Sequence, residues 1–166
     1  VAALGNDKAV LAKHAFAKTK SLRHPHILQF LDGSDTDAEV VVITEEVTPL
    51  PDWLEKQRDP DSSVSPEQLS AVTIWGVKCV LEALGFLHSQ GMVHGSVCPE
   101  AIFVTRSGDF KLWGLDVASA VNGPEWGFFQ SAERQLETLA SGGHAFRAPE
   151  LRNGDWEKVS RTFAAV

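Results

Sequence analysis

"MVHGSVCPEAIFV", residues 92–104, joins a histidine turn to a short apolar strand. His94 leads into the turn, Pro99 fixes the backbone after it, and Ile102–Val104 has the β-branched and aromatic residues of a strand. This is the layout of a catalytic loop. Where an acid and a base might be expected, the turn nevertheless has small residues without a carboxylate or an amine: Gly95, Ser96, Cys98 and Ala101. The stretch is therefore either a site with unusual chemistry or a site whose chemistry has been lost.

A long helix is expected before the histidine turn. Ser65 and Gln68 have the spacing of a capping box, and Pro66 stands at the first helical position. Apolar residues continue at helical spacing to Ser89, and Gly91 is a usual helix terminator. The sequence therefore predicts one uninterrupted helix that ends just ahead of His94.

Strand-like segments follow the turn. "IFVT" and "FKLWGL" flank Ser107–Gly108, which predicts a two-stranded hairpin.

The first third of the chain predicts a helix followed by strands. Asn6 or Asp7 would cap a helix over about Lys8 to Leu22. "HILQFLDG" then reads as a strand that enters a turn at Asp32–Gly33, and Val40–Thr44 is a β-branched run typical of a buried strand. A short helix is expected at "PDWLEKQ".

Composition narrows the classes of function. The 166 residues suit one domain, and a hydrophobic share of 43% can form a core. The net charge of −7 comes from 15 basic and 22 acidic residues, with no basic stripe, so nucleic-acid binding by a positive face is excluded. Cys79 and Cys98 form no CxxC pair, which favours a reducing intracellular compartment. The apolar runs are short, so no membrane span is expected.

Three catalytic or metal-binding hypotheses start from the histidine turn. Cys98 with His94 could form a nucleophile pair, but a small residue that fills a vacated site is the favoured interpretation. Ser96 with His94 could act as a hydrolase, but the G-x-S-x-G elbow is missing. His88, His94 and Cys98 could bind zinc, but their spacing matches no structural zinc pattern.

The order of the segments resembles a protein kinase. Residues 80–116 are similar to the kinase stretch from the long helix through the catalytic and magnesium-binding loops, and "HAFRAPEL" is similar to the Ala-Pro-Glu segment at Ala148–Glu150. "SLRHPHILQFLDG" resembles the end of the αC helix and the strand after it. The resemblance implies an α+β, protein-kinase-like fold with a partial small lobe, from αC to the hinge, and the first part of a mainly helical large lobe. The expected boundaries are 1–48 and 49–166. The strands before and the helices after this region are expected to be missing, which would expose sheet edges and apolar surface.

The kinase pattern assigns charged groups to positions that hold none in this chain. Ser96 stands where a kinase has the catalytic aspartate, Cys98 where it has a lysine, and Ala101 where it has the asparagine that binds magnesium. Gly114 stands at the magnesium-binding aspartate, and Ala15 at the glutamate that pairs with the strand lysine. A hydroxyl is too weak a base near neutral pH to replace a carboxylate. These losses indicate a pseudokinase.

Two features leave ligand binding open. Asp116 could serve as a metal ligand only in a shifted register, and no metal site is expected. Thr44 stands at the gatekeeper position and Glu45, Glu46 and Val47 at the hinge. Hinge contacts to adenine use backbone atoms and survive substitution, so ATP binding without magnesium and a plain interlobe linker remain equal alternatives.

The particular substitutions resemble the SCYL, or Scy-like, pseudokinases. "LRHPHILQFLDG", "TEEVTPL", "VHGSVCPEAIFV" and "FKLWGLD" carry this likeness. It implies a catalytically inactive scaffold or binding module in vesicle traffic or tRNA handling, with coat or trafficking proteins as partners. It also implies a cytoplasmic location, including association with the Golgi. The alternative is an atypical ATP-binding kinase with residual serine/threonine phosphotransferase activity, in which Asp116 or Asp109 rescues metal binding.

Overall fold

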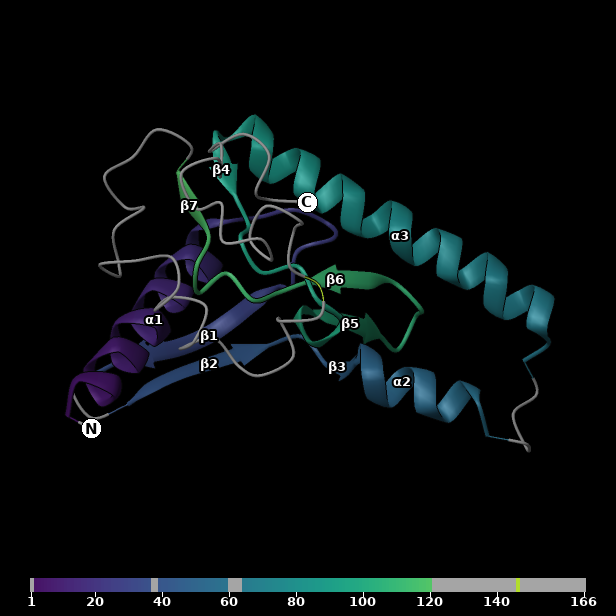
Figure 1. The fold of residues 1–166 in the computed structure, drawn as a ribbon, viewed down its shortest axis with the longest axis horizontal. Coiled ribbons are helices and arrows are strands. Elements are labelled where there is room, and N and C mark those ends of the chain that lie inside the picture. The colour runs from purple at the N-terminus through teal and green to yellow at the C-terminus, as the bar shows by residue number, and fades with distance from the viewer. Residues whose placement is uncertain (1, 37–38, 60–63, 121–145, 147–166) are drawn as a thin grey trace.

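The computed structural model describes residues 2–36, 39–59, 64–120 and 146, and the predicted Ala148–Glu150 segment lies outside them. Figure 1 shows α1 beside the β1–β2 hairpin and α3 beside the β5–β6 hairpin. The elements in chain order are α1 (Ala2–Ser21), β1 (Phe30–Asp35), β2 (Val40–Thr44), β3 (Val47–Pro49), α2 (Leu50–Gln57), α3 (Pro66–Ser89), β4 (Met92–Val93), a 3-10 turn (Pro99–Ala101), β5 (Ile102–Thr105), β6 (Phe110–Leu112) and β7 (Ser119–Ala120). The prediction of an α+β, protein-kinase-like fold is confirmed.

The β1–β2 hairpin shows that the turn predicted at Asp32–Gly33 is wrong. Asp32 and Gly33 do not turn the chain, because they lie in β1 and pair with Ile43 and Val42. A Cβ atom at Gly33 would lie 2.3 Å from the Val41 carbonyl oxygen, so glycine is needed here because the two strands approach closely, and not because the chain turns.

The helix before the hairpin begins at Ala2, and the predicted cap at Asn6 or Asp7 is wrong because helix-forming residues precede both.

Helix α3 begins and ends as its sequence predicts. The Ser65 hydroxyl oxygen accepts a hydrogen bond from the Gln68 N–H at 3.2 Å, and the Gln68 side-chain oxygen accepts one from the Ser65 N–H at 2.8 Å. This is the complete capping box. At the other end Gly91 has a φ of +66°, a conformation that a side chain disfavours.

A three-stranded antiparallel sheet, ordered β3–β5–β6, packs on α3. Phe110 of β6 lies against the helix at Gly76, where an added Cβ atom would come within 2.6 Å of the ring. Trp53 of α2 meets the Phe110 ring edge-on, with 5.7 Å between centroids. Glycine in the middle of α3 therefore lets an aromatic ring of the sheet reach the helix backbone.

Residues 26–28, in the loop before β1, form backbone hydrogen bonds with strand β6. The Leu112 N–H donates to the His26 carbonyl at 2.8 Å, and the Leu28 N–H donates to the Leu112 carbonyl at 3.0 Å. Ile27, Leu112 and Leu115 are almost fully buried in one cluster with α3. The small-lobe and large-lobe elements therefore share a core. The division at residue 48 stays a prediction.

Helix α3 is long and apolar enough to cross a membrane when judged by length and composition alone. The expectation that the chain has no membrane span stays a prediction. Several residues of the helix are buried against the sheet and the chain after it: Gly76, Cys79, Ala83, Leu84 and Leu87. The same composition therefore also fits a helix of a protein core.

Candidate functional site: the histidine turn and its neighbours

His94 is held in the core by both of its ring nitrogens. It follows β4, which pairs with β7, and its side chain is fully buried. The Ser96 N–H donates to His94 Nδ1 at 3.2 Å, so His94 Nε2 carries the proton and donates to the Trp113 carbonyl at 2.8 Å. Burial lowers the pKa of His94, and the Trp113 carbonyl and the Asp116 charge oppose that shift. His94 is therefore a neutral structural residue.

This geometry prevents His94 from acting as the base for a nucleophile in the turn. A general base needs a free ring nitrogen within hydrogen-bond distance of the proton that it accepts. Both nitrogens of His94 already bond to backbone groups, one of them the amide of Ser96 itself. The hypotheses of a Ser96–His94 hydrolase and a Cys98–His94 pair therefore have no structural support.

Cys98 has the properties of an unreactive thiol. It is half-buried and free, and its burial raises the pKa of the thiol, as do the hydrogen bond and charge of Glu100. A reactive cysteine needs the opposite shift. Within the described residues no three His, Cys, Asp or Glu side chains are grouped to hold a metal ion, so the zinc hypothesis with His88 finds no support there.

The structure brings Ala101 and Gly114 together. The Trp113 N–H donates to the Ala101 carbonyl at 2.7 Å, which places the next residue, Gly114, over the Ala101 side chain. A Cβ atom at Gly114 would lie 3.1 Å from the Ala101 Cβ and 3.6 Å from His94 Cε1. Gly114 also has a φ of +84°, which disfavours any side chain. The two positions that hold magnesium ligands in the kinase pattern therefore meet here as a methyl group and a hydrogen atom.

Helix α1 reaches this region through His14. The His14 Nδ1–H donates to the Asp116 backbone carbonyl at 2.9 Å. Ala15, at the expected glutamate position, is the next residue of the helix and is half-buried. The contact joins residues 102 positions apart, and no sequence pattern indicated it. Asp116 is thus placed by its backbone, and it belongs to no candidate metal cluster among the described residues.

The hinge side chains bond to the protein itself. The Thr44 hydroxyl donates to the Glu45 carbonyl at 3.1 Å, which is one of the backbone groups offered to adenine in the sequence hypothesis. The Glu45 carboxylate accepts from the Gln29 N–H at 2.9 Å. Glu46 is exposed, and Val47 begins β3 opposite Thr105 of β5. The hinge is therefore continuous with the three-stranded sheet.

Lys111 joins the hinge to the loop before β1, and sequence reasoning missed it. Its Nζ donates to the Pro25 carbonyl at 2.6 Å and lies 3.5 Å from the Glu45 carboxylate. Only 13% of the Lys111 side chain and 22% of the Glu45 side chain are exposed, so this pair is partly protected from solvent screening. The partners of Lys111 lie far away in the sequence and could not be inferred from its neighbours.

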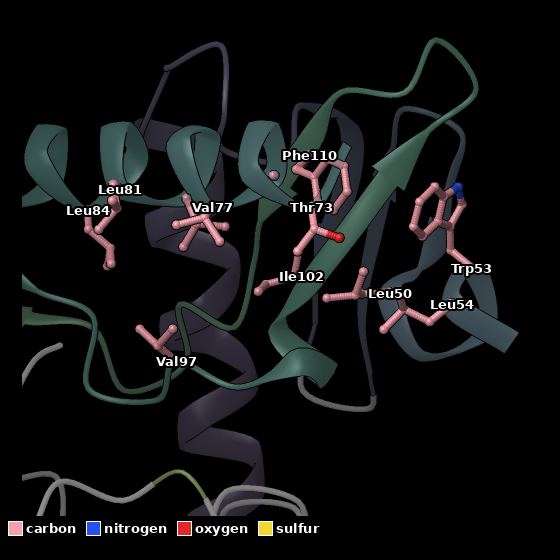
Figure 2. A pocket seen from close by; sticks show the side chains of 12 residues that line it. Leu50, Trp53, Leu54, Thr73, Val77, Leu81, Leu84, Val97, Ile102 and Phe110 are labelled. Atoms are coloured by element: carbon pink, nitrogen blue, oxygen red, sulfur yellow. The ribbon is translucent and has the colours of Figure 1, made fainter. Parts of the chain in front are cut away.

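An apolar groove borders the histidine turn at Val97. Figure 2 shows side chains from α2, α3 and β5–β6 converging on it, with Val97 of the turn at one edge. The groove has a volume of about 290 Å³. Its lining residues are Leu50, Trp53, Leu54, Thr73, Gly76, Val77, Val80, Leu81, Leu84, Val97, Ile102 and Phe110. No charged side chain lines it, so it is unsuited to a phosphate group.

A capped helix, a buried histidine turn and a hairpin that packs on the helix together define a protein-kinase-like domain. The chain belongs to the protein kinase family, since residues 9–160 match the model described as "Protein kinase domain".

The relatives of this chain include a protein named as a probable inactive kinase and proteins named simply as kinases. The chain is 28% identical over 157 residues to "Probable inactive serine/threonine-protein kinase scy1" of Dictyostelium discoideum, covering 94% of this chain and 17% of that protein. It is 31% identical over 120 residues to "SCY1-like protein 2" of Mus musculus, covering 68% and 13%. It is 29% identical over 136 residues to "Serine/threonine-protein kinase 36" of Pongo abelii, covering 80% and 9%.

These relatives confirm the resemblance to the SCYL group as well as a partial kinase domain. The chain spans less than a fifth of the length of each. One of these relatives is named as a probable inactive kinase and another as a serine/threonine-protein kinase, so family membership alone does not decide whether this chain catalyses phosphoryl transfer.

Proposed function

We propose that this chain is a catalytically inactive, protein-kinase-like domain that acts as a scaffold or binding module. The observation that carries the proposal is the contact between Ala101 and Gly114. A kinase neutralises the transferred phosphate with magnesium held by carboxylate and amide oxygens. Here the two positions supply no oxygen ligand from their side chains, and a side chain at Gly114 would press on Ala101 at 3.1 Å.

The remaining polar positions support the same proposal. Ser96 offers a hydroxyl instead of a carboxylate base, and its amide is bonded to His94. Cys98 is a thiol whose raised pKa keeps it neutral. A relative named as an inactive kinase matches 94% of the chain. Phosphoryl transfer would need several of these groups at once, because positioning and charge neutralisation carry most of its catalysis.

The cellular role follows from the resemblance to SCYL proteins. We infer that the domain serves vesicle traffic or tRNA handling in the cytoplasm or at the Golgi, through coat or trafficking proteins. The net charge of −7 supports protein partners over nucleic acid bound through a basic face.

Thermal unfolding with nucleotide tests the inactive state. In the protein that carries this chain, ATP with Mg²⁺ should stabilise the domain no more than ATP with EDTA. A bound ligand at 100 times its Kd would stabilise the domain by about 2.7 kcal/mol, which is readily measured. Stabilisation by ATP that is equal with and without Mg²⁺ identifies a metal-free nucleotide site and leaves the proposal intact.

The competing hypothesis is an atypical kinase that uses Asp116 or Asp109 for magnesium. It predicts a Mg²⁺-dependent shift that Asp116→Asn or Asp109→Asn abolishes and that Asp52→Asn retains. Asp52 is the matched control because it is an exposed carboxylate in the first turn of α2. That result, together with Mg²⁺-dependent phosphate transfer to a peptide, would overturn the inactive assignment.

A further inference from the structure

Two histidines in the loop between α1 and β1 face helix α3. The His24 ring stacks on Phe86, with 4.9 Å between centroids and 21° between planes. Its other neighbour is the His26 ring, which it meets edge-on at 5.7 Å. His26 Nε2 lies 3.1 Å from a Glu82 carboxylate oxygen, and its ring meets Trp75 edge-on at 6.2 Å. The loop is therefore attached to α3 through two titratable rings.

The hydrogen bonds of this loop require His24 to be neutral. The His26 N–H donates to His24 Nδ1 at 3.2 Å. A protonated imidazole has a hydrogen on both nitrogens and accepts no hydrogen bond. Protonation of His24 would therefore break this bond and leave the His26 N–H facing another donor. The loop would keep only the turn bond from the Ile27 N–H to the His24 carbonyl, at 3.1 Å, among the bonds that the described structure gives to His24.

Burial and neighbouring charges also disfavour a protonated His24. Burial lowers its pKa most, and His26 and Lys111 lower it further, whereas Glu82 raises it. Lys111 is fixed nearby through the Pro25 carbonyl. The Glu82 oxygens are engaged by His26 and by Lys78, at 3.1 and 3.4 Å.

The other charged groups around the loop do not compensate for a new cation. Arg23, next in sequence, donates to the carbonyls of Thr19 and Leu22. The Glu45 carboxylate lies beyond Lys111 and pairs with it. In the described part of the chain, no carboxylate lies within ion-pair distance of His24.

We propose that His24–His26 forms an acid-sensitive junction, at which protonation of His24 breaks the loop and loosens the attachment of α1 and β1 to α3. This inference does not depend on the proposed function. The loop carries the connection from the small-lobe helix to the shared core, because His26 and Leu28 bond to Leu112 on β6. Mild acid would thus weaken the joint between the two lobes.

The direction and ceiling of the effect follow from proton linkage. A histidine whose pKa is lowered in the closed loop stabilises that loop fully above about pH 6.5, and the stabilisation is lost as the pH falls below that value. Between pH 7.5 and 5.5, opening of the loop can become at most roughly tenfold more favourable from one such histidine.

Hydrogen exchange in the whole protein tests the proposal at the loop itself. Protection factors, which correct for the intrinsic pH dependence of exchange, are measured for peptides covering residues 22–30 at pH 7.5 and 5.5. We expect a several-fold loss of protection at pH 5.5. His24→Asn should remove that loss, because Asn can place an acceptor oxygen near the position of Nδ1 but does not take up a proton. His88→Gln is the control, because His88 is exposed on α3. This variant should lose protection at pH 5.5 to the same extent as the unmodified protein.

Equal protection at both pH values in the unmodified protein, or the same acid loss in His24→Asn, would overturn the proposal. If His24→Asn has already lost protection at pH 7.5, the ring titration decides instead. In the unmodified protein the His24 ring, followed by NMR, should take up its proton below about pH 6.5, the ordinary value for histidine. A His24 ring that takes up its proton at or above that value would refute the junction.

Discussion

Replacing Gly114 with alanine tests whether the magnesium position is closed to any side chain. The change adds a Cβ atom at a φ of +84°, only 3.1 Å from the Ala101 Cβ. The left-handed backbone costs about 1–2 kcal/mol for a residue with a side chain, and the forced contact adds on the order of 1 kcal/mol. We therefore expect Gly114→Ala to lower the free energy of unfolding by about 2–3 kcal/mol.

A matched control separates the two parts of that cost. Gly108 has a φ of +88°, but an added Cβ atom there has nothing within 4 Å. Gly108→Ala should therefore show only the backbone part, about 1–2 kcal/mol. Combining Gly114→Ala with Ala101→Gly removes the contact, so the double variant should be more stable than the sum of the single changes predicts, by about 0.5–1 kcal/mol.

Chemical denaturation followed by tryptophan fluorescence measures these differences, provided that the slope against denaturant is unchanged. Trp113, beside Gly114, is half-buried and should contribute to the signal. Gly114→Ala that is no more destabilising than Gly108→Ala, or strictly additive changes at residues 101 and 114, would refute the closed position.

Three further predictions concern stability. Ser65→Ala should lower the free energy of unfolding by about 1 kcal/mol, because it removes the cap of α3. Ser70→Ala, at an exposed site within the same helix, should change that free energy little. Equal losses in the two variants would contradict the capping role. Gly76→Ala should cost about 1–3 kcal/mol by pushing on the Phe110 ring, and Phe110→Leu should relieve part of that cost in the double variant. Because burial lowers the pKa of His94, its contribution to stability is present above about pH 6.5 and is lost toward acid. His94→Gln should therefore flatten the acid decline of the melting temperature, and an unchanged slope would argue against a neutral His94.

Local sequence patterns predicted the parts of the fold that local interactions determine. The Ser65–Gln68 capping box lies within four residues, and the helix terminator Gly91 acts on its own backbone, so both could be inferred from the sequence. The turn predicted at Asp32–Gly33 failed for the opposite reason. Both residues have turn propensity, but pairing with Val42 and the close approach to Val41 override it.

In the candidate site, too, the sequence predicted some features and missed others that depend on long-range packing. The kinase register placed Ala101 and Gly114 at the expected magnesium positions, and the structure shows how closely they meet. The bonds from His14 to Asp116 and from Lys111 to Pro25 could not be predicted, because they join residues 102 and 86 positions apart. Such contacts depend on how the finished elements pack, and neither has a signature in the neighbouring sequence.

During synthesis, residues 26–28 cannot form their backbone hydrogen bonds until Leu112 has been made. The chain leaves the ribosome from its N-terminus at about 5–20 residues per second, so Leu112 emerges roughly 4–17 s after Leu28. During that interval Ile27 and Leu28 lack their partner on β6, so the apolar surface that they bury in the finished protein stays exposed. Exposed apolar surface of this kind makes a folding chain prone to aggregation until the β5–β6 hairpin arrives.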